Sequence, residues 1–265
     1  MVLTAADVIG KLTAHIGTIE HTVDTLKVGN LHDEVQGIAV AFMPTSRVLE
    51  QAAAAGANLV IAHEGACFSH HDAFEQSLAS DGLYPDKLRI MKDAGIMLLR
   101  YHDYPHREQP DLITASLIEA LGWEQCVVSH TPAAAMLDIP AMTVAAVAER
   151  IKERLGIGYV RAAGDVAMRC TRIGVTVGYR GGGAVAIPLF ESEGAELVIC
   201  GEGPEWETPE YARDAAYGGK PRALIAIGHA ESEMPGMRAL AERLKRCYPQ
   251  LPVAFIPNEP VYRVL

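Results

Sequence analysis

Apolar and polar positions along the chain alternate in a way that is typical of an α/β protein. Short apolar runs of strand length are separated by stretches in which apolar residues recur at helical spacing. Strands are predicted at residues 37–42, 58–62, 96–101, 172–177, 196–200 and 223–227. Helices are predicted at residues 5–16, 47–55, 85–94, 111–121, 144–155, 184–192 and 236–247. The alternation of strand and helix in the first part of the chain favours a parallel sheet.

Other segments give weaker signals. Residues 23–30 and 159–163 suggest short extended pieces, and residues 69–72 a loop with a short helix. Residues 127–140 carry two prolines and no clear period. We place the boundary between two α/β halves, 1–128 and 129–265, in this last segment.

Two ten-residue stretches favour an internal duplication. Residues 56–65 read GANLVIAHEG and residues 194–203 read GAELVICGEG, with seven of ten positions identical. For the match alone, chance stays an alternative, because this pattern is common in parallel strands. Each copy, however, is followed by a helix-rich segment, a third strand and a His-x-x-x-His or His-x-x-x-Glu motif. This common order predicts two similar halves.

Histidine and glutamate follow directly after several of the predicted strands. In an α/β sheet, the carboxyl ends of the strands are where ligands bind. The candidate ligands at these ends are His63, Glu64, His102, His106, His229 and Glu233. They could converge if the strand ends of the two halves face each other. Imidazole and carboxylate without thiolate suit Zn, Fe, Mn, Co or Ni, and allow two ions with a bridging carboxylate. The alternative is that any single histidine is structural and that Ser232 or a glutamate caps the next helix.

Composition limits the class of protein. The chain has 49% apolar and 21% charged residues, as expected for a globular protein with a sizeable core. A net charge of −10 without a basic cluster argues against a surface for duplex nucleic acid. Scattered arginines are usually solvated, although they could bind a small anion. The arginines concerned are Arg100, Arg107, Arg161, Arg169, Arg172 and Arg180. Without a membrane-length apolar run or a signal peptide, we expect a cytoplasmic protein.

The five cysteines argue against a disulfide framework. They are widely spaced, odd in number and without a CxxC pair. Reduced and mostly buried thiols are expected, and a nucleophilic role for Cys67 or Cys200 is the less favoured alternative.

The chain also resembles the Nif-three-like family (dinuclear metal centre hexamers, often labelled GTP cyclohydrolase I type 2-like). The resemblance covers nearly the whole sequence. It rests on the motifs at residues 24–29, 57–64, 101–102, 146–156, 160–165, 173–183, 200–202 and 228–233. It implies two α/β halves around a mixed sheet, assembled as a toroidal homohexamer, a trimer of dimers, with the metals facing an internal cavity.

By position, the resemblance implies a ligand set with two departures. The implied ligands are His63, Glu64, His106, His229 and Glu233, with His102 beside them. Glu64 stands where the family has His, and His106 stands where it has Asp. The two departures are reciprocal, so three imidazoles and two carboxylates remain, which favours a site in use with redistributed ligands.

Two functions are compatible with these residues. The first is hydrolysis of a small cytoplasmic metabolite, such as a ring or an amide, by a hydroxide held between two metal ions. The second is non-catalytic metal binding, delivery or regulation. For the first, Asp103, Glu202 and Glu205 are candidate proton shuttles, and Tyr101 or Arg107 could orient the substrate.

Overall fold

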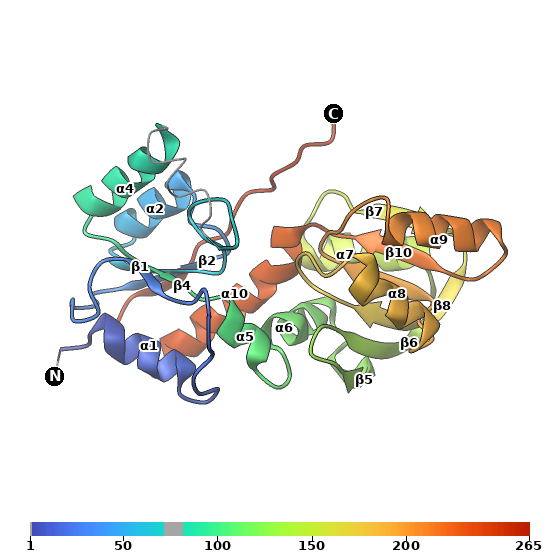
Figure 1. The fold of residues 1–265 in the computed structure, drawn as a ribbon, viewed down its shortest axis with the longest axis horizontal. Helices are drawn as coiled ribbons and strands as arrows, with labels where there is room; N and C mark the ends of the chain where they lie inside the picture. The colour runs from blue at the N-terminus through green and yellow to red at the C-terminus, as the bar shows by residue number, and fades with distance from the viewer. Residues whose placement is uncertain (1, 72–81) are drawn as a thin grey trace. The chain divides into compact units, whose positions relative to one another are not determined.

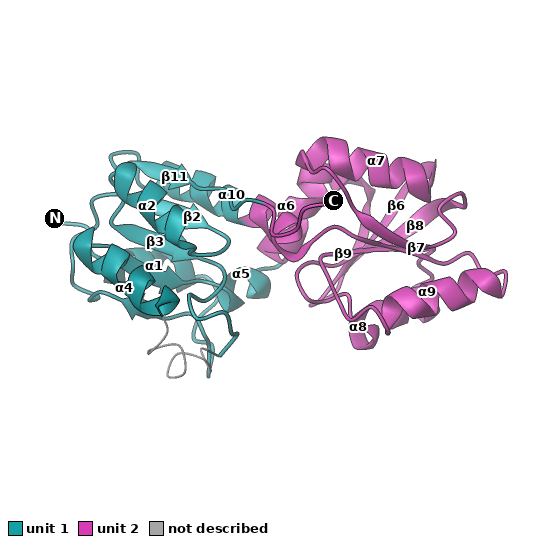
Figure 2. Ribbon diagram, turned by 90° about the horizontal axis from the view of Figure 1, so that it is seen from above, with its two compact units in different colours: residues 1–109, 237–259 teal, residues 110–236, 260–265 magenta. Residues whose placement is uncertain are grey.

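The computed structural model describes residues 2–71 and 82–265, and the chain in it divides into two compact units (Figure 2). Unit 1 comprises residues 1–109 and 237–259, and unit 2 comprises residues 110–236 and 260–265. The expected boundary at residue 128 thus lies inside unit 2. A division by contacts is not a test of duplication, so the halves 1–128 and 129–265 stay a prediction.

Unit 1 is built on a five-stranded sheet in the order β1-β4-β3-β2-β11. All neighbouring strands are parallel except β1, which is antiparallel to β4. Its strands are β1 Leu26–Val28, β2 Ile38–Ala41, β3 Leu59–Ala62, β4 Met97–Arg100 and β11 Val253–Phe255. Its helices are α1 Ala5–Thr13, α2 Ser46–Ala54, α4 Leu83–Asp93, α5 Asp103–Arg107 and the later part of α10 His229–Cys247.

Helices cover both faces of this sheet (Figure 1). Buried side chains of α2 and α4 pack with alternate residues of β2, β3 and β4 in one core. On the opposite face lie α1 and the unit 1 part of α10. The three central strands are buried along their whole length, which explains their continuous apolar runs.

Unit 2 is built on a six-stranded sheet in the order β5-β6-β8-β9-β10-β7. Its strands are β5 Val127–His130, β6 Ala135–Thr143, β7 Arg161–Gly164, β8 Arg169–Val175, β9 Leu197–Cys200 and β10 Ala223–Ala226. Its helices are α6 Leu112–Leu121, η1 Glu124–Cys126, α7 Val144–Leu155, α8 Gly183–Glu191, α9 Thr208–Tyr217 and the first part of α10. Helices α8 and α9 cover one face, and α7 covers the other (Figure 2).

The two units share one strand arrangement. The order β1-β4-β3-β2 in unit 1 corresponds to β7-β10-β9-β8 in unit 2. In each, the first strand is antiparallel to its neighbour and the other three are parallel. The predicted α/β fold with two similar halves is therefore confirmed, and the repeated sequence stretches occupy the same place, at β3 and β9.

The segment 127–140, for which no element was predicted, forms the hairpin β5–β6. Both prolines occupy positions that a strand tolerates. Pro132 lies in the turn, and Pro140 lies where the register of β6 against β8 shifts. The prolines interrupt the strand pattern of the sequence, but at these positions they do not prevent the strands from forming.

Helix α10 begins at His229, seven residues before the predicted start at residue 236. Pro235 and Gly236 suggested a helix start, but both lie inside the helix. A Cβ at Gly236 would lie 2.9 Å from Cα of Ile113 in unit 2, so the glycine allows close packing. Within the described part of the chain, none of the helices is both long and apolar enough to cross a membrane.

Candidate metal centre

Three imidazoles of unit 1 come together where β3 and β4 end. His63 follows β3, His102 follows β4, and His106 lies on the short helix α5. The ring centroids of His63 and His102 are 4.5 Å apart, and each lies 5.1 Å from that of His106. One nitrogen from each ring lies within 4.8 Å of the others, a spacing that a single ion can bridge. The parallel strands β3 and β4 produce this convergence because their carboxyl ends share one sheet edge.

The orientation of His63 is fixed by the backbone. Its side chain is fully buried, and Nδ1 lies 3.2 Å from the carbonyl oxygen of Tyr101. A carbonyl accepts only, so Nδ1 carries the proton and Nε2 presents its lone pair. This is the tautomer that a metal ligand needs.

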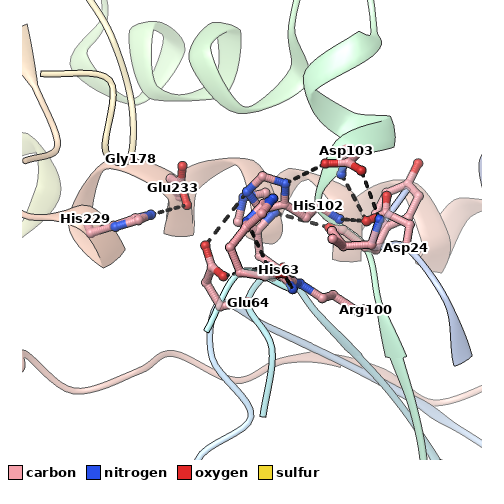
Figure 3. Close-up of polar contacts among 12 residues, drawn as sticks. Asp24, His63, Glu64, Arg100, His102, Asp103, Gly178, His229 and Glu233 are labelled. Carbon is pink, nitrogen blue, oxygen red and sulfur yellow. Dashed lines mark hydrogen bonds and ion pairs between the residues drawn. The ribbon is translucent and has the colours of Figure 1, made fainter. Parts of the chain in front are cut away.

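The orientation of His102 is fixed by a carboxylate. Nδ1 of His102 lies 3.0 Å from Oδ1 of Asp103. The other oxygen, Oδ2, accepts hydrogen bonds from the Thr22 hydroxyl at 2.8 Å and the Val23 amide at 3.1 Å. These bonds, that of His102 first, hold the pKa of Asp103 well below its usual range. Asp103 is therefore a charged acceptor that places the Nδ1 proton on His102 (Figure 3).

Asp24 ties the start of α5 to the segment before β1. Its Oδ1 accepts from the amides of His102 at 2.6 Å and Asp103 at 3.0 Å, and its Oδ2 accepts from that of Tyr104 at 2.9 Å. The carboxylate thus satisfies amides at the N-terminus of α5 that have no partner within the helix. Because α5 carries His106, Asp24 helps to position two of the three imidazoles.

Arg100 is a buried cation beneath the loop that follows β3. Its side chain is 1% exposed, and Nη2 lies 2.9 Å from Oε2 of Glu64. The guanidinium also donates to the backbone carbonyls of His63, at 3.4 Å, and of His70. The second oxygen of Glu64 lies 3.8 Å from Nε2 of His102. Glu64 therefore stands beside the imidazoles with its charge offset by Arg100.

Unit 2 holds a second group of imidazole and carboxylate. His229 and Glu233 lie one turn apart on α10, with Nε2 of His229 3.3 Å from Oε2 of Glu233 (Figure 3). Nδ1 of His229 lies 2.8 Å from Oε1 of Glu202, in the loop after β9. The hydrogen bond from His229 is the main cause that lowers the pKa of Glu202. As at His102, a carboxylate fixes Nδ1 and directs Nε2 away from itself.

The loop after β8 is shaped around this second group. Gly178 has a positive φ of 57°, and a Cβ there would collide with Oε1 of Glu233 and lie 3.1 Å from Nε2 of His229. Its amide donates to the Ser232 hydroxyl at 2.9 Å, which donates in turn to the carbonyl of His229 at 2.7 Å. The absence of a side chain at residue 178 leaves the space that the ligand atoms occupy.

Comparison with known proteins identifies the family. The family model described as Duf34/NIF3 (NGG1p interacting factor 3) matches residues 20–260. The chain belongs to the Duf34/NIF3 family. A search of the curated proteins found no match.

Solved structures share the fold of this Duf34/NIF3 chain. A hypothetical protein of Staphylococcus aureus has 19% identity and a TM-score of 0.76, covering 100% of both chains. A Bacillus cereus protein related to NIF3 has 13% identity and a TM-score of 0.75, covering 99% of both chains. Reduced HcgD of Methanocaldococcus jannaschii has 17% identity and a TM-score of 0.72, covering 97% of this chain and 98% of its own. At these identities the likeness shows the fold alone.

The predicted ligands of the Duf34/NIF3 chain fall into two groups, one in each unit. Unit 1 brings together His63, Glu64, His102 and His106, and unit 2 brings together His229 and Glu233, with Glu202. That all six ligands serve one centre stays a prediction. The donors in each group are nitrogen and oxygen, which suits the divalent transition metals expected from the sequence.

The other residues named from the sequence have specific places. Asp103 and Glu202, the candidate proton shuttles, each contact Nδ1 of an imidazole, and Glu205 forms an exposed ion pair. The Tyr101 hydroxyl is buried and donates to the Leu12 carbonyl at 3.1 Å, so it supports the core and does not face a substrate. Arg107 is exposed.

Sequence reasoning missed several residues of the site. Arg100 was expected to be solvated but is buried, because it is the last residue of β4 and its guanidinium lies beside Glu64. Asp24 was noted only within a motif, and its role depends on partners 78 to 80 residues away. His70 also lies near, with its ring centroid 4.8 Å from that of His102. The His70-His71 doublet was the available signal, and residue 72 of that stretch lies outside the described residues.

Proposed function

We propose that this Duf34/NIF3 protein is a metal-dependent hydrolase of a small molecule and holds two divalent transition metal ions per chain. The convergence of His63, His102 and His106 carries the proposal. Nδ1 of His63 is held by the carbonyl of Tyr101, and Nδ1 of His102 is held by the carboxylate of Asp103. In both imidazoles the lone pair of Nε2 is therefore available to a metal ion. Imidazole and carboxylate donors without thiolate fit Zn, Fe, Mn, Co or Ni.

A divalent ion at such a site supplies Lewis acidity and brings the pKa of a bound water toward neutrality. The side chains of this protein would do the rest. Asp103 and Glu202 keep the Nδ1 protons on His102 and His229, and so preserve the ligating tautomer. Arg100 offsets the charge of Glu64, so this carboxylate lies beside the imidazoles with a buried cation as its partner. We expect the substrate of such a site to be a small molecule with a hydrolysable ring or an amide bond.

Metal analysis and a substrate screen test the proposal. Purified protein should carry about two ions per chain after loading with each of the five metals, measured by plasma mass spectrometry. His106→Ala should lose one ion, whereas His32→Ala, at an exposed histidine of the same unit, should lose none. A loaded protein that hydrolyses cyclic or linear amides only when metal is present would support the enzyme. Metal lost in His106→Ala without hydrolysis by any loaded form would instead favour metal binding or delivery.

A further inference from the structure

We infer that a cavity in unit 2 binds a zwitterionic small molecule with an apolar part, such as an apolar α-amino acid. The cavity has a volume of about 490 Å³, within the range of small-molecule sites. The candidate metal ligands are not among the residues that line it. The inference therefore goes beyond the proposed hydrolase function and does not depend on it.

The cavity lies at the edge of the sheet where α/β proteins bind ligands. Cys200 and Ala226, the last residues of the parallel strands β9 and β10, both line it. So does Arg161, the first residue of β7, which pairs with Ala226 because β7 is antiparallel to β10. All three residues thus lie at the carboxyl ends of β9 and β10. Helix α9, which packs against β7 and β10, contributes Glu210 and Arg213.

Two loops close one side of the cavity with backbone rather than side chains. The amide of Gly181 donates to the carbonyl of Glu202 at 3.0 Å. A Cβ at Gly181 would lie 2.6 Å from that carbonyl oxygen, and a Cβ at Gly203 would lie 2.5 Å from the carbonyl carbon of Gly181. The glycines therefore allow the two loops to pack directly against each other, and the shape of this wall does not depend on side-chain rotamers.

The floor of the cavity is apolar. It is formed by Leu224 and Ala226 of β10 and by Cys200, and the side chains of Leu224 and Cys200 are buried. Contact with such a floor removes apolar ligand surface from water, which favours a ligand with a hydrocarbon part.

The charged side chains that line the cavity form two ion pairs. Nη1 of Arg161 lies 2.7 Å from Oε1 of Glu205, and Arg213 pairs with Glu210 one turn earlier on α9. With two cations and two anions, the lining gives no preference to a ligand whose charge has only one sign. Exposed ion pairs contribute little to stability, so a ligand can compete with either pair.

The less exposed member of one pair is a cation, and that of the other pair is an anion. Arg161 is 54% exposed against 81% for Glu205, whereas Glu210 is 45% exposed against 75% for Arg213. Among the residues that the structure describes, Nη2 of Arg161 and Oε1 of Glu210 have no hydrogen-bond partner. A ligand carboxylate can accept from Arg161 and a ligand ammonium group can donate to Glu210. An α-amino acid offers both groups, and its apolar side chain can then lie on the floor.

Analogues of leucine test the charge requirement without added bulk. L-Leucine carries both charges, isocaproate lacks the ammonium group, isoamylamine lacks the carboxylate, and isocaproamide is neutral. Glycine carries both charges but has no apolar part. Binding to the full-length protein is measured by saturation-transfer NMR and calorimetry. We expect L-leucine to bind most tightly and each of the other probes to bind about tenfold more weakly, because each lacks one of the contacts.

Two charge variants should give a crossed pattern. Arg161→Met removes the partner of the carboxylate, so it should weaken binding of leucine and isocaproate by about tenfold and leave that of isoamylamine unchanged. Glu210→Gln removes the partner of the ammonium group, so it should weaken binding of leucine and isoamylamine and leave that of isocaproate unchanged. Arg89→Met and Glu242→Gln are the matched controls, since both residues form exposed ion pairs within one helix and do not line the cavity.

A further variant separates this cavity from the candidate metal centre. Amino acids can chelate metal ions, so leucine binding is also measured in His106→Ala, which should bind leucine as the unaltered protein does. Circular dichroism confirms that each variant is folded. Absence of leucine binding at millimolar concentration, binding of isocaproate or isoamylamine as tight as that of leucine, absence of the crossed pattern, or loss of leucine binding in His106→Ala would each overturn the inference. A failure to detect hydrolysis leaves all of these outcomes unaffected.

Discussion

The carboxylate of Asp103 accepts a hydrogen bond from Nδ1 of His102 at 3.0 Å, while its other oxygen accepts hydrogen bonds from Thr22 and Val23. A carboxylate with both oxygens engaged is suited to orient a ligand and less suited to carry protons to a substrate. In unit 2, Glu202 accepts a hydrogen bond from Nδ1 of His229 at 2.8 Å. Both units thus use a carboxylate and an imidazole in the arrangement that orients metal ligands in many proteins.

Asp103→Asn should weaken metal binding by about tenfold to a hundredfold. The amide removes the charge that stabilises the Nδ1 proton on His102, so Nε2 loses basicity and the ring loses its fixed orientation. Metal affinity is measured by competition with a chelating dye. Asp86→Asn serves as the control, because Asp86 forms an exposed ion pair with Arg89. Equal affinity in the Asp103 and Asp86 variants would show that the carboxylate does not support the metal.

A pair of glycine variants separates collision from backbone strain. Gly178 and Gly219 both have a positive φ, of 57° and 75°, but a Cβ at Gly219 would meet nothing within 4 Å. Gly219→Ala should therefore lower the free energy of unfolding by about 1 kcal/mol, the cost of the left-handed backbone.

Gly178→Ala carries the same backbone cost and also drives a methyl group against Glu233. We expect a loss of about 2–4 kcal/mol in the free energy of unfolding and a loss of the bound metal that depends on His229 and Glu233. Urea unfolding and metal analysis measure the two effects. If Gly178→Ala behaves like Gly219→Ala in both, the loop after β8 is not shaped around Glu233.

The sequence predicted the residues whose signal is local. His63 and His229 follow apolar runs of strand length, and residues 144–155 show a clear helical period, so these features could be predicted from the sequence. The repeated stretches at β3 and β9 were also predicted, because parallel strands buried on both faces appear in the sequence as continuous apolar runs.

The residues that escaped prediction act over long separations. Arg100 acts on Glu64, 36 positions away, and the amide of Gly178 binds Ser232, 54 positions away. A single sequence gives no information on such pairs, because the partner of an arginine or glycine is set by the folded sheet and not by its neighbours in the sequence. Strand β11 was missed for a related reason, because three residues show no period and its pairing with β2 depends on the parallel sheet edge.

Self-association is a further prediction, proposed from the homohexamer that the family resemblance implies. The structure adds exposed apolar residues near the end of the chain, where Val261, Tyr262, Val264 and Leu265 are each more than 70% exposed. Burial of such residues between copies would contribute favourable free energy. Light scattering should give a mass of about six times the chain mass of 28.5 kDa. Replacement of Val261 and Val264 with Ser should reduce that mass, and a monomer at micromolar concentration would contradict the proposal.

The reciprocal exchange of Glu64 and His106 also involves Arg100, because Arg100 forms an ion pair with Glu64. Glu64→His should weaken metal binding by removing negative charge beside the imidazoles. It should also lower the free energy of unfolding by about 3 kcal/mol, because buried Arg100 loses the carboxylate at 2.9 Å. His106→Asp should weaken or alter metal binding by adding charge and removing an imidazole, with a smaller effect on stability since His106 is half-buried.

The double variant Glu64→His with His106→Asp should recover at least part of the metal affinity, because it restores three imidazoles and two carboxylates to the predicted ligand set. The free energy of unfolding should stay low, since no step of the cycle returns a carboxylate to residue 64 beside Arg100. Metal affinity and urea unfolding across the four proteins measure the two responses separately. If the effects of the single changes on metal affinity simply add in the double variant, Glu64 and His106 do not serve one centre, and the exchange is not a compensated redistribution of ligands.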